Sequence, residues 1–219
     1  MMNESMRLLQ NVLIWAIPIL FAVTVHEVAH GWVASKLGDK TALLMGRITL
    51  NPFKHIDLIG TIIVPLVFLM VGGFIFGWAK PVPVDWRNLR NPRRDMALVA
   101  VAGPIANLIM VFIWACVAKI SMLISDSGVG PAKAFVYMGL AGISINIMLM
   151  ILNLIPIPPL DGSRVLASFL SRKWAMQFDK IEPFGFMILV LLIFSGLLMF
   201  VLSPIYEGVQ TFFYTIFAI

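Results

Sequence analysis

The chain has 219 residues, of which 60% are hydrophobic and only 12% charged, and its mean hydropathy is +0.96. Soluble domains contain about 45–50% apolar and about 25% charged residues, so this chain has too few charges to cover a water-facing surface. A soluble enzyme is therefore excluded. The net charge of +5 arises from basic residues in short loops between apolar runs, a pattern that indicates membrane orientation and not nucleic-acid binding.

Apolar stretches long enough for membrane helices recur along the whole chain, each spanning helix needing about 20 residues. They cover residues 11–37, 56–79, 96–124, 134–160, 184–202 and 209–219, the last being too short to span unless it begins near Pro204. The predicted fold class is an all-α polytopic membrane protein with about four to six membrane helices. Because no polar run reaches domain size, residues 1–219 are expected to form a single domain, with a core at about 10–165 and accessory helices at 166–219.

Three segments depart from the pattern of straight membrane helices. Residues 41–50 are β-prone and end at an Asn-Pro pair, which predicts a short strand. Residues 78–85 contain two prolines, which exclude a helix and fit an edge strand. Residues 56–79 carry a proline and a glycine pair in mid-run, which predicts a re-entrant segment.

The first apolar stretch contains the sequence His26-Glu27-Val28-Ala29-His30. A spacing of four residues places both imidazoles on one helix face, where they can hold one metal ion. Glu27 lies on the same flank as His30 and can act as a base for water at the metal. A chance match is disfavoured, because an acid at membrane depth costs at least about 2.5–3.5 kcal/mol.

A third metal ligand must come from elsewhere, since catalytic zinc usually takes three protein ligands and one water. Asp161 is the downstream acid that ends a long apolar helix and does not lie in a charged loop. The prolines just before it break that helix, and broken backbone at membrane depth is tolerated only inside protein or beside water. Asp161 can therefore reach a metal or cap the following segment, and the histidine pair favours the ligand.

The third apolar stretch contains Gly103-Pro-Ile-Ala-Asn107. Gly103 is expected to let another backbone approach closely. Asn107 presents an amide at membrane depth, which either contacts the substrate carbonyl or oxyanion or forms an interhelical hydrogen bond. Asn146 and Asn153 are seven residues apart on one face of the fourth stretch, and Asn146 is expected to be a packing residue.

The motifs HEVAH at 26–30, GPIAN at 103–107 and NLIPIPPLDG at 153–162 together resemble those of the site-2 protease family of intramembrane zinc metalloproteases. The resemblance covers about residues 20–165 and matches the order and spacing of all three motifs. It implies one Zn²⁺ per chain held by His26, His30 and Asp161, with Glu27 as the catalytic acid and base. It also implies that Asn153 lines the cleft. The chain resembles the minimal form, in which neither a PDZ-like nor a C-terminal regulatory domain is expected.

Sharing one zinc requires that the first and fourth apolar stretches end at the same membrane face, so the segment at 56–79 must dip in and return. All 16 Lys and Arg residues except Arg7, Lys119 and Lys133 then lie on one side. The positive-inside rule places that side in the cytoplasm. We therefore expect a multi-pass protein of a bacterial-type plasma membrane with its active site towards the cytoplasm.

The function expected from these features is hydrolysis of peptide bonds in or near transmembrane segments of membrane protein substrates. Such a substrate must unwind, and the strand-like segments would offer an edge along which it extends. The alternative is a membrane metal transporter or sensor that uses the same ligands without hydrolysis. A transporter should carry polar residues leading to both faces and internal repeats, whereas the acids here cluster towards one face.

Overall fold

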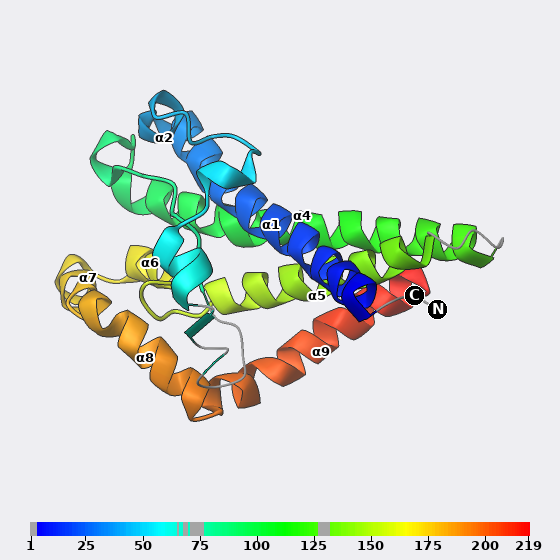
Figure 1. The fold of residues 1–219 in the computed structure, drawn as a ribbon. Helices are drawn as coiled ribbons and strands as arrows, with labels where there is room; N and C mark the ends of the chain where they lie inside the picture. The colour runs from blue at the N-terminus through cyan, green and yellow to red at the C-terminus, as the bar shows by residue number, and fades with distance from the viewer. Residues whose placement is uncertain (1–3, 65, 68–69, 71–76, 127–131) are drawn as a thin grey trace.

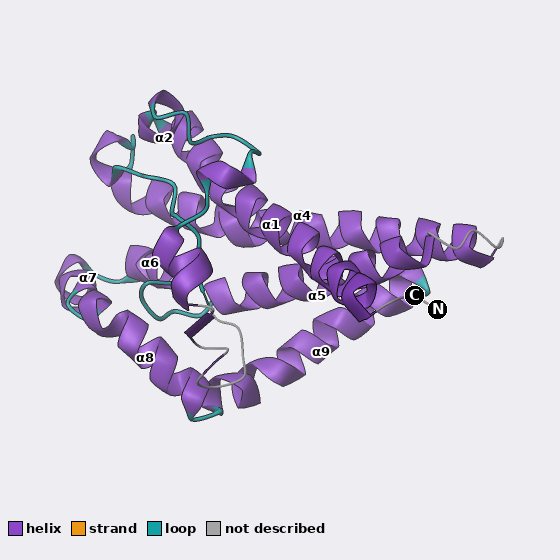
Figure 2. Ribbon diagram, in the orientation of Figure 1, coloured by secondary structure: helices purple, strands orange, loops and turns teal. Residues whose placement is uncertain are grey.

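The structure is a computed structural model that describes residues 4–64, 66–67, 70, 77–126 and 132–219. Every regular element among these residues is helical (Figure 1, Figure 2). The long helices are α1 (Glu4–Leu37), α4 (Pro92–Asp126), α5 (Ala132–Asn153) and α9 (Leu197–Phe217). The shorter helices are α2 (Thr41–Leu44), η1 (Pro52–Lys54), η2 (Leu58–Ile63), η3 (Trp86–Asn88), α6 (Asp161–Phe169), α7 (Arg172–Asp179) and α8 (Glu182–Phe194).

Three of the described helices are long and apolar enough to cross a membrane: Val12–Leu37 of α1, Pro92–Ser125 of α4, and α5. Helices α8 and α9 meet at a bend of 77° and add a fourth span only if the pair is counted as one broken span. The described part of the chain therefore has three or four candidate spans, against the four to six predicted.

The core of the bundle lies where α4, α5 and α9 meet. Helix α5 packs most extensively on α4, and small residues make the close approach possible. A Cβ on Gly139 would lie 2.7 Å from the backbone nitrogen of Ala118, and a Cβ on Gly142 would overlap the Trp114 ring. The buried side chains of this core are Met110, Val111, Trp114, Ala115, Ala118, Ile143, Ile147, Ile151, Leu160, Leu189, Leu198, Leu202 and Phe213.

The directions of the helices bring the ends of α1 and α5 to the same end of the bundle (Figure 1). The start of α4 lies beside the C-terminal end of α1. The Arg90 backbone nitrogen, just before α4, donates to the carbonyl of Leu37, the last residue of α1, at 3.1 Å. The connection 38–91 therefore leaves and re-enters the bundle at one end, as shared metal binding requires. Of the predicted re-entrant segment, residues 58–63 form the π-helix η2, whereas Pro65 and the Gly72-Gly73 pair lie outside the described residues.

The two predicted β-strands are wrong. Residues 41–44 form the helical turn α2, and no strand occurs at 41–50, at 78–85 or elsewhere in the described residues. A strand needs a neighbouring strand with which it exchanges a regular ladder of hydrogen bonds. In the 78–85 segment the prolines have no N–H, and four of the other backbone N–H groups go to separate partners. Trp78 N donates to Gly60 O, Lys80 N to His55 O, Val82 N to the Glu27 side chain, and Asp85 N to the Asp39 side chain.

Asp39 ties the 78–85 segment to the end of α1. Its buried carboxylate accepts hydrogen bonds from the backbone nitrogens of Thr41 and Asp85, at 3.0 and 2.7 Å, and from the Asn88 amide at 3.1 Å. Burial raises the pKa of Asp39, but hydrogen bonds to its charged form, first the one from the Thr41 hydroxyl and then the three above, outweigh it, so the pKa lies below its ordinary value. The segment is thereby held against the helix that carries the two histidines.

Candidate metal centre

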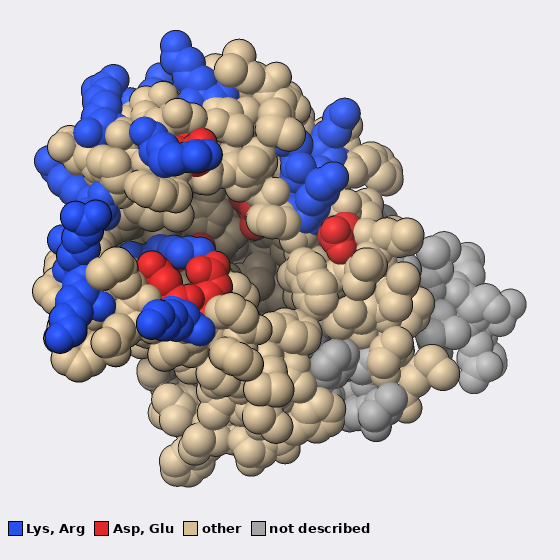
Figure 3. Space-filling view, turned by 90° about the vertical axis from the view of Figure 1, so that its left-hand side faces the viewer, with Lys and Arg blue, Asp and Glu red and all other residues tan. Residues whose placement is uncertain are grey.

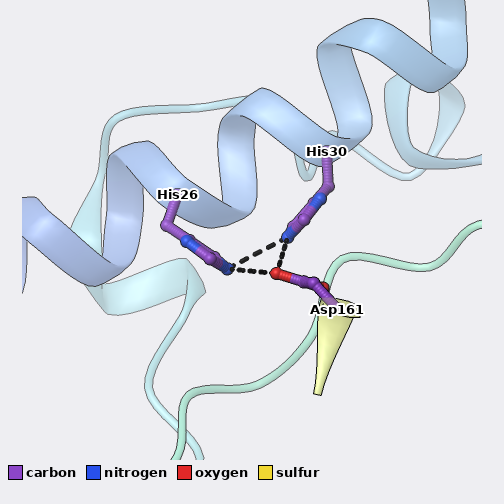
Figure 4. A group of neighbouring side chains, drawn as sticks. All are labelled: His26, His30 and Asp161. Carbon is purple, nitrogen blue, oxygen red and sulfur yellow. Dashed lines mark hydrogen bonds and ion pairs between the residues drawn. The ribbon is translucent and has the colours of Figure 1, made fainter. Parts of the chain in front are cut away.

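His26, His30 and Asp161 converge on one point from two helices (Figure 4). The histidines lie one turn apart on α1, and Asp161 is the first residue of α6. The two Nε2 atoms are 3.0 Å apart, and Asp161 Oδ2 lies 3.2 Å from Nε2 of His26 and 3.3 Å from Nε2 of His30. The helical spacing and the break after α5 therefore combine to place three potential ligand atoms together.

The spacing of these three atoms fits a zinc ion. Tetrahedral ligands at about 2.0–2.1 Å from zinc lie about 3.3 Å from one another. Asp161 Oδ2 is buried and has no hydrogen-bond partner among the described residues, which is costly for a carboxylate oxygen without a cation. The donor set of two imidazoles and one carboxylate is also one that zinc prefers.

The outer nitrogen of each histidine has a protein acceptor. His26 Nδ1 lies 2.6 Å from Asn107 Oδ1, and His30 Nδ1 donates to the Val99 carbonyl at 2.7 Å. With the hydrogens on Nδ1, both Nε2 lone pairs face the same point. Two lone pairs at 3.0 Å repel each other, so the arrangement calls for a cation between them and Asp161.

Asp161 reaches this point because the end of α5 is broken and α6 starts beside it. The cap position of α6 is Leu160, and no side-chain hydrogen bond caps the helix, so Asp161 does not act as an N-cap. A Cβ on Gly162 would overlap the carbonyls of Leu154 and Ile155, so glycine is required for this close approach.

The backbone of Gly103 packs directly against the His26 and His30 imidazoles. A Cβ at this position would lie 2.5 Å from His26 Cε1 and 2.6 Å from Nε2 of each histidine. The sequence correctly indicated a close approach at Gly103, but the approaching groups are two imidazoles and not another backbone. Any side chain here would occupy the space next to the metal ligands.

Glu27 lies at the edge of the cluster and contacts the 78–85 segment. Its Oε2 accepts a hydrogen bond from the Val82 backbone nitrogen at 2.7 Å. Glu27 lines the same cavity as the three clustered side chains. Val82 was not predicted as a site residue, because its contribution comes from the backbone and no side-chain pattern could reveal it.

A cavity of about 820 Å³ opens beside the cluster, between α1, α5, α8 and the 78–85 segment. It lies towards the end of the molecule seen in Figure 3, where Lys and Arg side chains surround a hollow with Asp and Glu near its centre. The walls are largely apolar and include Val82, Val84, Leu149, Leu152 and Leu189. A smaller hollow of about 450 Å³ between α1 and α5 has no acid, histidine or cysteine among its described lining residues.

The two asparagines predicted near the site lie in different places. Asn153 lines the cavity and donates from Nδ2 to the Leu149 carbonyl at 2.9 Å. Asn107 is completely buried behind His26, is not among the described residues that line the cavity, and donates from Nδ2 to Asn146 Oδ1 at 2.9 Å. Of the two readings of Asn107, the observed contacts are those of an interhelical hydrogen bond, and Asn146 is part of it. The presence of Asn146 in an otherwise apolar stretch was the sequence feature that could have indicated the Asn107–Asn146 hydrogen bond.

A bundle of membrane-length helices that encloses a His, His and Asp cluster beside a glutamate defines a polytopic membrane protein with a candidate metal centre. The family profile described as Peptidase family M50 matches residues 14–138 and 122–196. The chain therefore belongs to peptidase family M50, which confirms the resemblance to site-2 proteases.

Individual relatives agree with this family. YwhC of Bacillus subtilis (strain 168) is 38% identical over 193 residues, which cover 86% of this chain and 83% of YwhC. Rip2 of Mycolicibacterium smegmatis is 28% identical over 178 residues, which cover 80% of this chain and 64% of Rip2. Both relatives are provisionally named zinc metalloproteases. No solved structure gives a significant match to this chain.

Proposed function

We propose that the protein is an intramembrane zinc endopeptidase that hydrolyses peptide bonds in or near transmembrane segments of membrane proteins. The observation that carries the proposal is the convergence of His26, His30 and Asp161 at the edge of a cavity that Glu27 also lines. Membership of peptidase family M50 and the names of YwhC and Rip2 support both the reaction and the metal.

His26, His30 and Asp161 would hold the zinc ion, which when bound supplies Lewis acidity towards water and a peptide carbonyl. Glu27 accepts a proton from the attacking water and delivers it to the leaving amine. The Val82 N–H donates to Oε2 of Glu27 and holds that oxygen in place. The other oxygen of Glu27, Oε1, has no hydrogen bond to a described residue. That second oxygen is the atom we assign to proton transfer.

The substrate would be a single peptide strand from an unwound transmembrane helix, because an intact helix keeps its carbonyls in internal hydrogen bonds. The apolar walls of the cavity suit apolar side chains of such a segment. Asn153 lies on the cavity wall where its amide can contact the substrate backbone. The 78–85 segment also lines the cavity and is the surface against which we place the substrate.

We place the active site towards the cytoplasm. Arg7 lies near the start of α1, Lys119 near the end of α4 and Lys133 near the start of α5. Many Lys and Arg side chains lie on the face of the molecule that carries the hollow (Figure 3). Such an excess of Lys and Arg is typical of cytoplasmic loops.

Cysteine labelling tests this orientation. Single cysteines at positions 54, 90 and 172, in a Cys116→Ala background, should resist a membrane-impermeant thiol reagent on intact cells, whereas one at position 126 should react. Labelling at 54, 90 and 172, with protection at 126, would reverse the orientation. Labelling at 90 and 172 but not at 54 would show that the connection between α1 and α4 crosses the membrane.

The proposed function is tested by comparing Glu27→Gln with His26→Ala. Both variants should leave substrates uncleaved in membrane fractions, detected by quantitative proteomics against wild type. Only His26→Ala should lose zinc, measured by elemental analysis of purified protein, because Glu27 acts on protons and does not hold the metal. Full proteolysis by Glu27→Gln would refute the mechanism, and metal-dependent transport without cleavage by wild type would favour the transporter alternative.

A further inference from the structure

A chain of hydrogen bonds runs from His26 at the metal centre through a buried side chain of α4 to α5. Asn107 and Asn146 are both 0% exposed, and they connect three membrane-length helices. The bonds are Asn146 Nδ2 to Gly142 O at 2.8 Å, Asn107 Nδ2 to Asn146 Oδ1 at 2.9 Å, Asn107 Nδ2 to Ala22 O at 3.2 Å, and His26 Nδ1 to Asn107 Oδ1 at 2.6 Å.

The direction of this chain is fixed by backbone carbonyls, which can only accept hydrogen bonds. The Gly142 carbonyl requires that Asn146 present its NH₂ group there, which turns Asn146 Oδ1 towards Asn107. Asn107 must then present its own NH₂ group to Asn146 and to the Ala22 carbonyl. Asn107 Oδ1 is thereby left facing His26, so the hydrogen of that imidazole must lie on Nδ1.

We propose that Asn107 and Asn146 are positioning residues that hold His26 in the Nδ1–H tautomer, with Nε2 bare and aimed at the metal. The inference rests on the proposed zinc site and assigns a role to two side chains that do not line the cavity. An acceptor on the outer ring nitrogen fixes the orientation and tautomer of a metal-binding histidine.

The two histidines differ in how they are held. His30 Nδ1 donates to the Val99 backbone carbonyl, an acceptor that side-chain substitution leaves in place. His26 depends on the Asn107 amide, which could rotate and present NH₂ to Nδ1 if its own anchors were lost. A rotated amide would favour the Nε2–H tautomer, whose Nε2 has no lone pair to offer to a metal at this centre. The anchors at Ala22 and Asn146 therefore act through Asn107 on the metal site.

The test measures zinc affinity by chelator competition in purified protein, together with the visible spectrum of the Co²⁺-substituted form. Asn107→Leu removes the acceptor and should weaken zinc binding by about 10–100-fold and alter the Co²⁺ spectrum. Asn107→Asp still presents an oxygen to His26 and should stay much nearer to wild type. Asn146→Leu removes one of the two anchors of Asn107 and should give a loss between those of the other two variants.

The matched control is Gln210→Leu, which removes a half-buried amide that links α9 to Ser144 of α5 without touching the metal centre. It should bind zinc like wild type. If Asn107→Leu does not fold, the comparison of Asn146→Leu with Gln210→Leu decides, because only Asn146→Leu should weaken zinc.

Unchanged zinc affinity in Asn146→Leu, or equal losses in Asn107→Asp and Asn107→Leu, would overturn the proposal. Zinc binding by wild type and its loss in His26→Ala must hold in the same assay. If wild type binds no zinc, the proposed function fails as well, so the two failures are distinguishable.

Discussion

Replacing Gly103 by alanine adds one methyl group against the His26 and His30 imidazoles. The new Cβ would lie 2.5–2.6 Å from Cε1 of His26 and from Nε2 of both histidines. Non-bonded carbon atoms pack at about 3.5–4.0 Å, so the imidazoles would have to retreat by roughly 1 Å. Zinc–ligand distances tolerate only about 0.2 Å. We therefore expect Gly103→Ala to weaken zinc binding by at least about 10–100-fold, the size of effect seen when a ligand loses its support.

The assay for Gly103→Ala is chelator competition for zinc, with thermal unfolding of the zinc-free protein alongside. Two glycines supply controls: nothing lies within 4 Å of a Cβ on Gly208, and a Cβ on Gly139 would meet the Ala118 backbone far from the site. Gly208→Ala should behave like wild type. Gly139→Ala should lower thermal stability without selectively weakening zinc, since overpacking costs about 1–3 kcal/mol. Wild-type zinc affinity in Gly103→Ala would refute the geometry described for the centre.

Three further predictions concern the carboxylates and the 78–85 segment. Asp161→Asn replaces an anionic ligand by a neutral amide and should lose both zinc and proteolysis, measured by elemental analysis and substrate cleavage; unchanged zinc occupancy would remove Asp161 from the ligand set. Val82→Pro removes the N–H that holds Glu27 and should reduce the cleavage rate by about 10–100-fold, as expected for a hydrogen bond of about 1.5–3 kcal/mol to a charged group, with zinc content preserved. Because the pKa of Asp39 is lowered by folding, its stabilisation is full above about pH 3.8 and is lost as the pH falls through the lowered value. The difference in thermal stability between wild type and Asp39→Asn should therefore shrink in acid, and a constant difference would contradict that linkage.

The sequence was most informative where polar residues are rare. Within an apolar helix, two histidines four residues apart must share a face, because the helical period fixes their directions. Asp161 could be singled out because it follows a long apolar stretch whose prolines must break the helix. The other acids downstream of the histidines do not follow such a stretch. These are local constraints of backbone geometry and membrane solvation, and the structure brings the three side chains together as they require.

The tertiary structure decided everything that depends on a neighbour distant in the chain. Residues 41–50 and 78–85 have strand-like composition, but a strand forms only beside another strand. Four donors of 78–85 instead go to Gly60 of η2, the His55 carbonyl, Glu27 and Asp39. The contact of Gly103 with the imidazoles and the burial of Asn107 behind His26 likewise follow from how α1, α4 and α5 cross. Sequence spacing determines which residues share a face of one helix, whereas the packing of several helices determines what that face contacts.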